Sequence, residues 1–331
     1  MMKKSISLMA VGGLALALMA GRGTSGRRPV HRHPAGDLKL DFRTDDDAVF
    51  SRPVSISHDR DVIYVIDAEE NEVRVFSKTG TFIRAFGRKG QGPGEFDSPA
   101  DLDVSGDRIY VTDRFNKRIQ VLDRKGGYLG GFKVPFTPDQ ICVLSGGRII
   151  LSHLPLGIEG REPMVHAFSE MGNLLWEQAN SYYSGDRVYD AFRNFVVMVK
   201  GDREDILIVH KSDERGVFRF DKEGKSGVAI RVADEFEFKR ISLPIKGSKR
   251  QVSGFCWDAT FDKGSLGLLA LDDTEENDLG PGREVFLVAP DGFVKDIIDL
   301  PAAVTRIDMD GDDLYAVDTE NRLRVFRRGQ R

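Results

Sequence analysis

The sequence has little cysteine, no excess of charge of either sign, and no long apolar run beyond its first residues. Two cysteines in 331 residues are too few for a disulfide framework or a four-cysteine zinc module. The 48 basic and 52 acidic side chains give a net charge of −4, which argues against a nucleic-acid partner. Apolar residues make up 40% of the chain, so a hydrophobic core is expected rather than general disorder.

The apolar run at the N-terminus is predicted to be an export signal. Lys3 and Lys4 precede an apolar stretch over residues 6–20, which is short for a membrane-spanning helix of about 20 residues. We therefore predict a signal peptide over residues 1–21 and a periplasmic or extracellular protein without stable membrane insertion. An uncleaved N-terminal anchor is the alternative.

The segment after the predicted signal differs from that of a lipoprotein. Residues 18–21 are similar to the sequence before a lipidated cysteine in bacterial lipoproteins, but Arg22 stands at the acceptor position. Lipid anchoring is therefore not expected. Residues 22–36 are rich in Gly, Arg, Pro and His and are predicted to form a disordered linker.

Glycine is abundant, at 35 of 331 residues, and it recurs in turns that follow apolar strands. The first two intervals between these turns are equal, 126 − 80 = 46 and 172 − 126 = 46, and the later ones vary. A fixed spacing of this size is typical of repeat folds. The glycines are Gly80, Gly126, Gly172, Gly224, Gly292 and Gly329.

A second marker has the same phase as the glycine turns. Short β-prone runs that end in one polar residue lie at 63–67, 109–113, 149–153, 206–210, 268–272 and 314–318. Each repeat therefore contains short strands separated by Gly, Asp and Asn turns, as in an antiparallel meander. Six such units of four strands predict an all-β fold, a six-bladed β-propeller.

The last repeat contains only three predicted strands, so the ring needs one more strand to close. Residues 38–42 alternate apolar with polar side chains, and we predict that they pair with the strand around 323–327. Closure removes sheet edges that would otherwise be exposed. The propeller is accordingly predicted as a single domain over residues 37–331.

The second repeat resembles the NHL repeat closely. It has a Gly-rich segment at 90–96, Pro99, a strand at 108–113 and the segment 116–121. The first and sixth repeats share Tyr, Asp, Asn and Phe positions with it, at Tyr64, Asp67, Asn71, Phe76, Tyr315, Asp318, Asn321 and Phe326. The chain is thus similar to exported bacterial six-bladed propeller proteins related to NHL repeats. This resemblance implies a fold that mostly binds partners on one face, although some members are lyases or lactonases with a metal at the channel.

The polar residues that end the β-prone runs are expected to form a ring on one face of the disc. The aspartates are predicted to accept hydrogen bonds from backbone N–H groups of the adjoining turns. His153 and His210 replace the aspartate in two adjacent repeats and are weak candidates for zinc or calcium ligands. No third ligand has a suitable spacing, so no cofactor is predicted. The ring comprises Asp67, Asp113, His153, His210, Asp272 and Asp318.

Basic and aromatic residues on the connections between repeats are further binding candidates. Basic side chains gather near the first and second repeats, and an acidic segment lies at 272–278. Tyrosines occur in the connection 177–191, and Trp257 follows the connection 233–253. The predicted ligand-binding residues are Arg88, Arg114, Arg118, His153, His210 and Trp257.

The sequence favours a monomeric binding propeller that holds a peptide, glycan or protein partner on its connection-bearing face. The alternative is a metal-dependent lyase or hydrolase with its site at the channel mouth. No catalytic residue is assigned, because no nucleophile with recognisable partners is evident. Cys142 and Cys256 fall in non-neighbouring repeats and are predicted to be buried free thiols.

Overall fold

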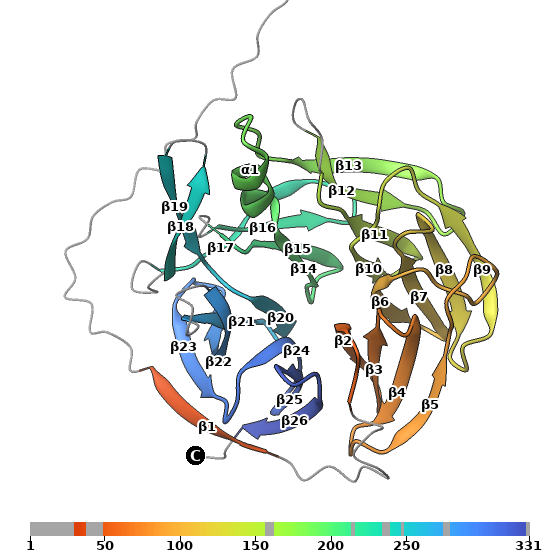
Figure 1. Ribbon diagram of the computed structural model, residues 1–331, viewed down its shortest axis with the longest axis horizontal. Helices are drawn as coiled ribbons and strands as arrows, with labels where there is room; N and C mark the ends of the chain where they lie inside the picture. The colour runs from red at the N-terminus through yellow and green to blue at the C-terminus, as the bar shows by residue number, and fades with distance from the viewer. Residues whose placement is uncertain are drawn as a thin grey trace, which may run out of the picture.

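The computed structural model is a six-bladed β-propeller, which confirms the predicted fold class (Figure 1). It describes residues 30–37, 49–155, 162–212, 216–233, 239–245, 248–273 and 279–328. The blades surround a central axis, and each runs from an inner strand at the axis to an outer strand at the rim. The predicted signal peptide over residues 1–21 lies outside the described residues.

Blades one to five each consist of four consecutive antiparallel strands, and blade six contributes three. Blades one to three are β2 (Pro53–Asp59), β3 (Val62–Asp67), β4 (Glu72–Ser77), β5 (Phe82–Phe86); β6 (Pro99–Ser105), β7 (Arg108–Asp113), β8 (Arg118–Asp123), β9 (Tyr128–Lys133); and β10 (Gln140–Leu144), β11 (Arg148–Ser152), β12 (Pro163–Phe168), β13 (Leu174–Asn180). Blades four to six are β14 (Val196–Lys200), β15 (Asp205–His210), β16 (Gly216–Asp221), β17 (Ser226–Arg231); β20 (Asp258–Asp262), β21 (Ser265–Asp273), β22 (Leu279–Val288), β23 (Val294–Asp299); and β24 (Val304–Asp310), β25 (Asp313–Asp318), β26 (Leu323–Arg328).

The second strand of each blade is apolar on both faces because a neighbouring blade packs against each side. Tyr64 and Ile66 of β3 join Ile109 of blade two in one core cluster. Ile63 of the same strand packs instead against Tyr315 of blade six. The hydrophobic core is therefore divided among the junctions between blades, and the continuous apolar runs of the sequence reflect burial on both faces.

The turn glycines are required both by backbone conformation and by close packing. Gly126 has φ 92° and Gly172 has φ 78°, in the left-handed region that favours glycine. A Cβ on Gly126 would lie 2.4 Å from the Phe86 ring, and one on Gly172 would lie 2.7 Å from Phe132. Each turn thus packs against an aromatic side chain on the outer strand of the preceding blade. Gly329 lies outside the described residues.

An N-terminal strand closes the ring, but it is not the strand that the sequence predicts. Strand β1 (His31–Asp37) pairs in parallel with β23 and in antiparallel with β26, giving the order β20-β21-β22-β23-β1-β26-β25-β24. The expected segment, residues 38–42, lies outside the described residues. The strand instead overlaps the end of the segment 22–36 that was expected to be a linker, so the propeller begins before residue 37.

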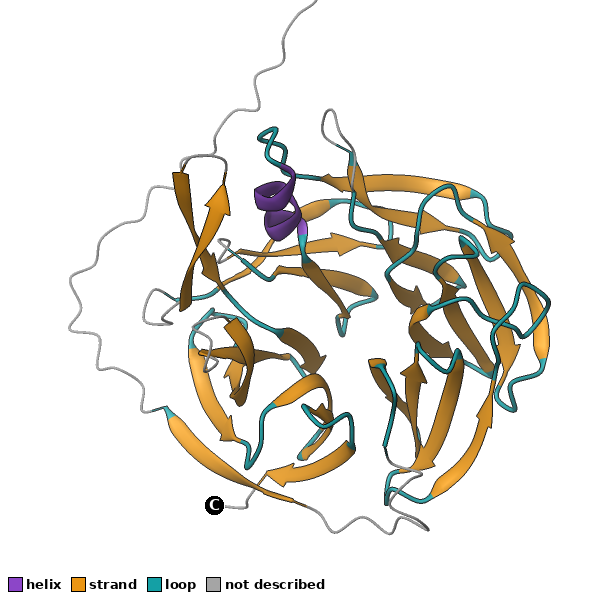
Figure 2. Cartoon of the chain, viewed as in Figure 1, coloured by secondary structure: helices purple, strands orange, loops and turns teal. Residues whose placement is uncertain are grey.

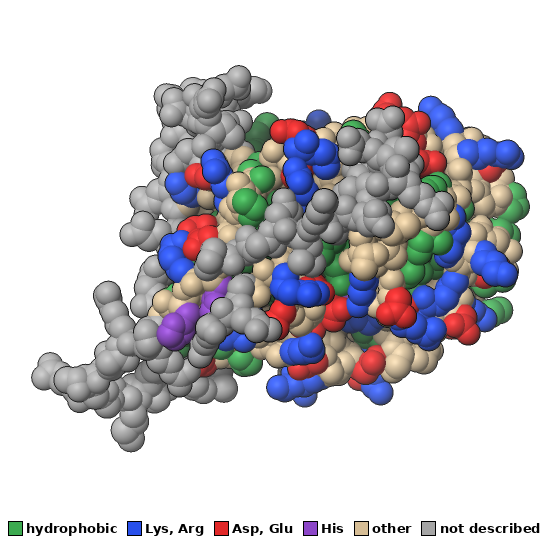
Figure 3. All heavy atoms as spheres, turned by 90° about the horizontal axis from the view of Figure 1, so that it is seen from below, with side chains coloured by type: hydrophobic (Ala, Val, Ile, Leu, Met, Phe, Trp, Pro, Cys, Tyr) green, Lys and Arg blue, Asp and Glu red, His purple; other side chains and the backbone are tan. Residues whose placement is uncertain are grey.

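The composition of β1 does not identify it as a strand, because its pairing is made by backbone groups at the rim of the disc. Arg32 is exposed and lies 2.6 Å from carboxylate oxygens of both Glu284 and Asp299. The edge of the disc drawn in Figure 3 shows basic and acidic side chains intermixed, without a patch of one sign. A polar sequence such as His-Arg-His-Pro therefore suits this outer position, although it resembles a linker.

Two insertions interrupt the regular ring on one side (Figure 2). Helix α1 (Arg187–Asn194) lies in the connection between blades three and four, and the hairpin of β18 (Lys239–Ile245) and β19 (Ser248–Gly254) lies between blades four and five. At eight residues α1 is far shorter than a membrane span, and the described ranges contain no helix that reaches that length. Cys142 and Cys256 are buried and free, as predicted.

Candidate functional site

The inner strands β2, β6, β10, β14, β20 and β24 line a central cavity of about 570 Å³. Each inner strand starts at a connection from the preceding blade and ends at the hairpin turn to its own second strand. The first residues of these strands therefore lie at one end of the channel and their last residues at the other. We call these ends the connection mouth, where Arg52, Arg114, Asp139, Lys211, Asp258 and Arg306 lie, and the hairpin mouth, where His58, Asp103, Lys200, Asp202, Asp262, Lys263 and Asp308 lie.

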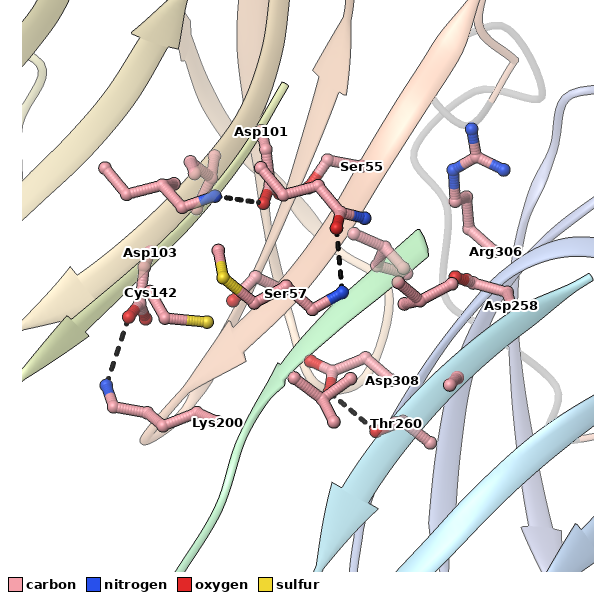
Figure 4. A pocket seen from close by; sticks show the side chains of 18 of the residues that line it. Ser55, Ser57, Asp101, Asp103, Cys142, Lys200, Asp258, Thr260, Arg306 and Asp308 are labelled. Atoms are coloured by element: carbon pink, nitrogen blue, oxygen red, sulfur yellow. Dashed lines mark hydrogen bonds and ion pairs between the residues drawn. The ribbon is translucent and has the colours of Figure 1, made fainter. Parts of the chain in front are cut away.

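Many polar side chains of the channel bond one blade to the next. Asp101 accepts a hydrogen bond from the Ile141 N–H at 2.9 Å. The same relation recurs around the ring at Asp103–Val143, Gln140–Met198, Asp258–Ile307, Thr260–Met309, Asp262–Gly311 and Asp308–His58, over 2.6–3.2 Å. Figure 4 shows several of these side chains on neighbouring strands. These groups stabilise the ring, so ligand binding depends on groups that this bonding does not use.

Charges at the hairpin mouth are largely paired. His58 Nδ1 lies 2.6 Å from Asp308 Oδ2, and Lys200 Nζ lies 3.1 Å from Asp103 Oδ2. Burial by itself would lower the pKa of His58, but the hydrogen bond and the charge of Asp308 raise it above the ordinary value. Burial opposes the charge of Lys200 in the same way, and Asp103 raises the pKa of that ammonium. These pairs leave little unbalanced charge at this mouth.

At the connection mouth, by contrast, several cations contact neutral groups. Arg306 Nε donates to the Val54 carbonyl at 2.6 Å, and Arg52 Nη2 donates to Ser98 Oγ at 3.0 Å. The Lys211 ammonium lies 5.9 Å from the centre of the Trp257 ring, within reach of a cation–π contact.

Arg52 Nε lies 3.7 Å from Glu69 Oε2, and Arg114 also has a close carboxylate. Its Nη2 lies 3.1 Å from Asp139 Oδ1, whereas its buried Nε has no hydrogen-bond partner in the part of the chain that the structure describes. Asp139 also accepts a hydrogen bond from the Leu154 N–H at 2.7 Å.

Three carboxyl groups near this mouth are held toward their neutral forms. Burial raises the pKa of Asp101 to about 7, although hydrogen bonds from Ser55 and the Ile141 N–H oppose the shift. Burial likewise raises the pKa of Asp139 against the charge of Arg114, and that of Asp258 against Arg306. Burial therefore disfavours the charged form of these carboxyl groups beside the cations.

The structure places the sequence-predicted arginines in two different settings. Arg114 lines the channel, whereas Arg118 is bonded to the connection between blades one and two. Its Nε lies 2.6 Å from Asp113, and its Nη2 donates to the Gly92 and Glu95 carbonyls. Arg88 pairs with Glu95 at 2.7 Å with a side chain that is 79% exposed. The structure thus brings Arg114 to the channel and leaves Arg88 and Arg118 on the connection.

Trp257 lies at the connection mouth, beneath Lys211, although its ring is not part of the channel lining. Its buried indole Nε1 has no hydrogen-bond partner among the described residues.

The histidine pair has surroundings that the sequence did not indicate. His153 stacks on Phe136 with ring centres 4.5 Å apart, and its Nδ1 lies 3.0 Å from His166 Nε2. Burial, with a smaller contribution from His166, lowers the pKa of His153 to about 4, well below the ordinary value of a histidine. His210 Nδ1 lies 3.2 Å from the Arg193 carbonyl of α1. Neither histidine lines the channel cavity.

The described residues contain no group of three or more His, Cys, Asp or Glu side chains arranged to hold a metal ion. Asp67, Asp113 and Asp318 instead behave as the turn-bonding aspartates that the repeat predicts. Asp113 is fully buried and accepts from the Asp97 N–H at 2.8 Å. Asp272, which was also predicted to belong to the ring, is exposed. Most of the acidic segment 272–278 lies outside the described residues.

Sequence reasoning missed three cations of the connection mouth, Arg52, Lys211 and Arg306. A usable signal existed for Arg306, because it and Asp308 are charged residues two positions apart in one strand and therefore share a face of it. Lys211 directly follows the polar position that ends β15, but nothing local shows that it turns toward the axis.

Comparisons with known proteins agree with this architecture. The sequence profile of the family DUF5128, described as a 6-bladed beta-propeller, matches residues 39–162. NHL repeat-containing protein 3 of Homo sapiens is 33% identical over 98 residues, or 27% of this chain and 28% of that protein. The resemblance to NHL-type six-bladed propellers is confirmed. The matched region spans well under a third of the curated relative's length.

Solved structures share the fold at low sequence identity. A candidate exported protein from Bacteroides fragilis NCTC 9343 superposes with a TM-score of 0.61 at 11% identity, over 91% of this chain and 99% of that one. Virginiamycin B lyase from Staphylococcus aureus superposes with a TM-score of 0.51 at 10% identity, over 88% of this chain and 98% of that one. At such identities the likeness concerns the fold alone.

Proposed function

We propose that this protein is a binding propeller that holds its partner at the connection mouth of the channel. The difference between the two mouths carries the proposal: charges of the hairpin mouth are paired, whereas Arg306 and Lys211 of the connection mouth contact carbonyl and aromatic groups. The cavity of about 570 Å³ is of a size that ligand sites commonly have. A shared fold with a lyase favours neither binding nor catalysis.

The connections around this mouth supply further contact surface for a peptide, glycan or protein. Tyr182 and Tyr183, which precede α1, are 37% and 39% exposed. Arg193 lies 4.7 Å over the Tyr182 ring and so helps to fix its orientation. Ordered aromatic side chains lose little entropy on binding and are frequent in interfaces.

We propose export to the periplasm or the cell exterior as the setting for this binding. The basic residues and apolar run of the first 20 residues support it. The fold shared with a candidate exported protein agrees with the proposal.

Blocking one mouth at a time tests the proposed function. A bulky maleimide label on Arg52→Cys would obstruct the connection mouth, since the Arg52 side chain is 49% exposed. The matched control carries the same label on Lys263→Cys, an exposed position at the hairpin mouth. Cys142 and Cys256 should not react, because burial raises the pKa of the first thiol well above its ordinary value and that of the second to about 12.

Binding would be measured on arrays of peptides and glycans before and after labelling. We expect at least one probe whose binding is lost on labelling Arg52→Cys and is retained on labelling Lys263→Cys. Equal effects of the two labels, or no binding by the unlabelled proteins to any probe, would contradict the proposal.

A further inference from the structure

The two ends of the channel differ in how their positive charge is balanced. At the connection mouth, Arg52, Arg114, Lys211 and Arg306 line the cavity together with Asp139 and Asp258. At the hairpin mouth, His58, Lys200 and Lys263 face the carboxylates of Asp103, Asp202, Asp262 and Asp308. Cations therefore outnumber carboxylates at the connection mouth, whereas the two kinds of charge are nearly balanced at the hairpin mouth.

Two of the cations at the connection mouth have no carboxylate within ion-pair distance among the described residues. Arg306 donates through Nε to the Val54 carbonyl and through Nη1 to the Thr305 carbonyl, at 2.6 and 2.7 Å. Lys211 is partly buried, and its ammonium lies over the Trp257 ring. Carbonyls and aromatic faces solvate a cation without neutralising its charge.

These cations affect each other across the mouth. Burial lowers the pKa of Lys211; Asp258 opposes this shift, and the positive charge of Arg306 adds to it. A negative group placed between Lys211 and Arg306 would relieve this repulsion. The low dielectric of a partly buried cavity strengthens that attraction relative to open solvent.

Two carboxylates, Asp139 and Asp258, line this mouth beside four cations, so the negative charges are outnumbered. Asp139 is engaged by Arg114 at 3.1 Å and by the Leu154 N–H. Asp258 accepts a hydrogen bond from the Ile307 N–H at 3.0 Å and so belongs to the blade-to-blade bonding.

Arg114 has a donor at this mouth that also lacks a partner among the described residues. Arg114 Nε is buried and has no hydrogen-bond partner in the described part of the chain. A buried donor without an acceptor is costly, and an oxyanion brought into the mouth would supply acceptors.

We propose that the connection mouth binds an oxyanion of a small ligand, a carboxylate or a phosphate, with Arg114, Lys211 and Arg306 as its donors. This inference rests on the proposed function and specifies the chemistry of the ligand. Guanidinium groups suit such anions because their planar N–H donors match two oxygens at once, and the lysine adds a point charge. The neutral remainder of the ligand would occupy the cavity below.

Isothermal titration calorimetry at low salt with four probes tests this inference. Trigalacturonate and triglycine carry carboxylates on a sugar and on a peptide, inorganic phosphate carries the other anion, and maltotriose is the uncharged control. We expect at least one anionic probe to bind and maltotriose not to bind. The identity of the probe that binds shows whether the anion is a sugar carboxylate, a peptide carboxylate or a phosphate.

Variants at the two mouths locate the site. Lys211→Met keeps the aliphatic stem over Trp257 and should weaken binding of the anionic probe by about tenfold or more, because a charged donor is lost. Lys211→Arg should restore most of the affinity. The matched control, Lys263→Met at the hairpin mouth, should bind as the unchanged protein does.

Either of two results would overturn the inference: maltotriose binding as well as the anions, or Lys211→Met and Lys263→Met having equal effects. Absence of binding by all anionic probes also counts against it. The labelling experiment tests the proposed function separately. An uncharged ligand whose binding is blocked only by the label at Arg52→Cys would support binding at this mouth and would exclude the oxyanion. Unchanged thermal unfolding of each variant verifies that folding is intact.

Discussion

Blades two and three place the same kind of carboxylate on opposite strands. In blade two, Asp113 ends the second strand, lies opposite Pro99 of the inner strand, and accepts from the Asp97 N–H of the chain entering the blade. In blade three the register places His153 opposite Asp139, because Gln140 pairs with Ser152. Asp139 then accepts from the Leu154 N–H, in the connection from the second to the third strand of the same blade.

The difference teaches that a carboxylate at this level of the blade can bond a backbone N–H from either of the first two strands. Moving it to the inner strand has a functional consequence, because Asp139 lies at the connection mouth and pairs with Arg114. In blade three His153 therefore stands at the end of the second strand, where blade two has Asp113, and it stacks on the Phe136 ring. The departure from the repeat therefore lies beside the candidate site.

The largest expected effect comes from breaking the regular blade. Asp113→Ala removes the acceptor of Arg118, Asn116, Gln120 and a backbone N–H. We expect a loss of about 3–5 kcal/mol in the free energy of unfolding, as for a broken buried ion pair. Urea denaturation measures this loss. Asp123→Ala, in an exposed hairpin of the same blade, is the control, and an equal loss in both variants would refute the role given to Asp113.

A smaller effect is expected when the irregular blade is acidified. The pKa of His153 is about 4 in the folded protein against 6.5 ordinarily, so the unfolded chain binds the proton more readily. Stability is therefore fully present above pH 6.5 and is lost as the pH falls toward 4, by about 2 kcal/mol after allowing for partial exposure.

Denaturation curves at pH 7 and pH 4.5 measure this loss. His153→Asn should show a flatter dependence, because the asparagine does not titrate. If both proteins lose the same stability, the shift does not arise at His153.

The smallest effect sharpens the comparison between the two strands. His153→Asp restores the residue usual in the repeat but places a carboxylate opposite Asp139, and like charges on facing strands repel. We expect His153→Asp to be about 1 kcal/mol less stable than His153→Asn. In an Asp139→Asn background this difference should disappear. A persistent difference would show that the two positions do not interact.

The features that the sequence by itself determined are those set within one blade. The turn glycines, the apolar second strands and the turn-bonding aspartates depend on neighbours within one repeat or on the blade packed beside it. Because every blade meets the same requirements, the pattern recurs along the chain and is visible without a structure.

Only the tertiary structure decided which residues meet at the channel axis and which strand closes the ring between β23 and β26. Lys211 follows β15 of blade four and Arg306 lies within β24 of blade six, and ring closure brings both to one mouth. Strand β1 pairs through backbone groups at the rim, where no apolar face is needed, so composition did not reveal it. In each case the contact joins segments far apart in the sequence, and the physical reason is closure of the ring, which no single repeat encodes.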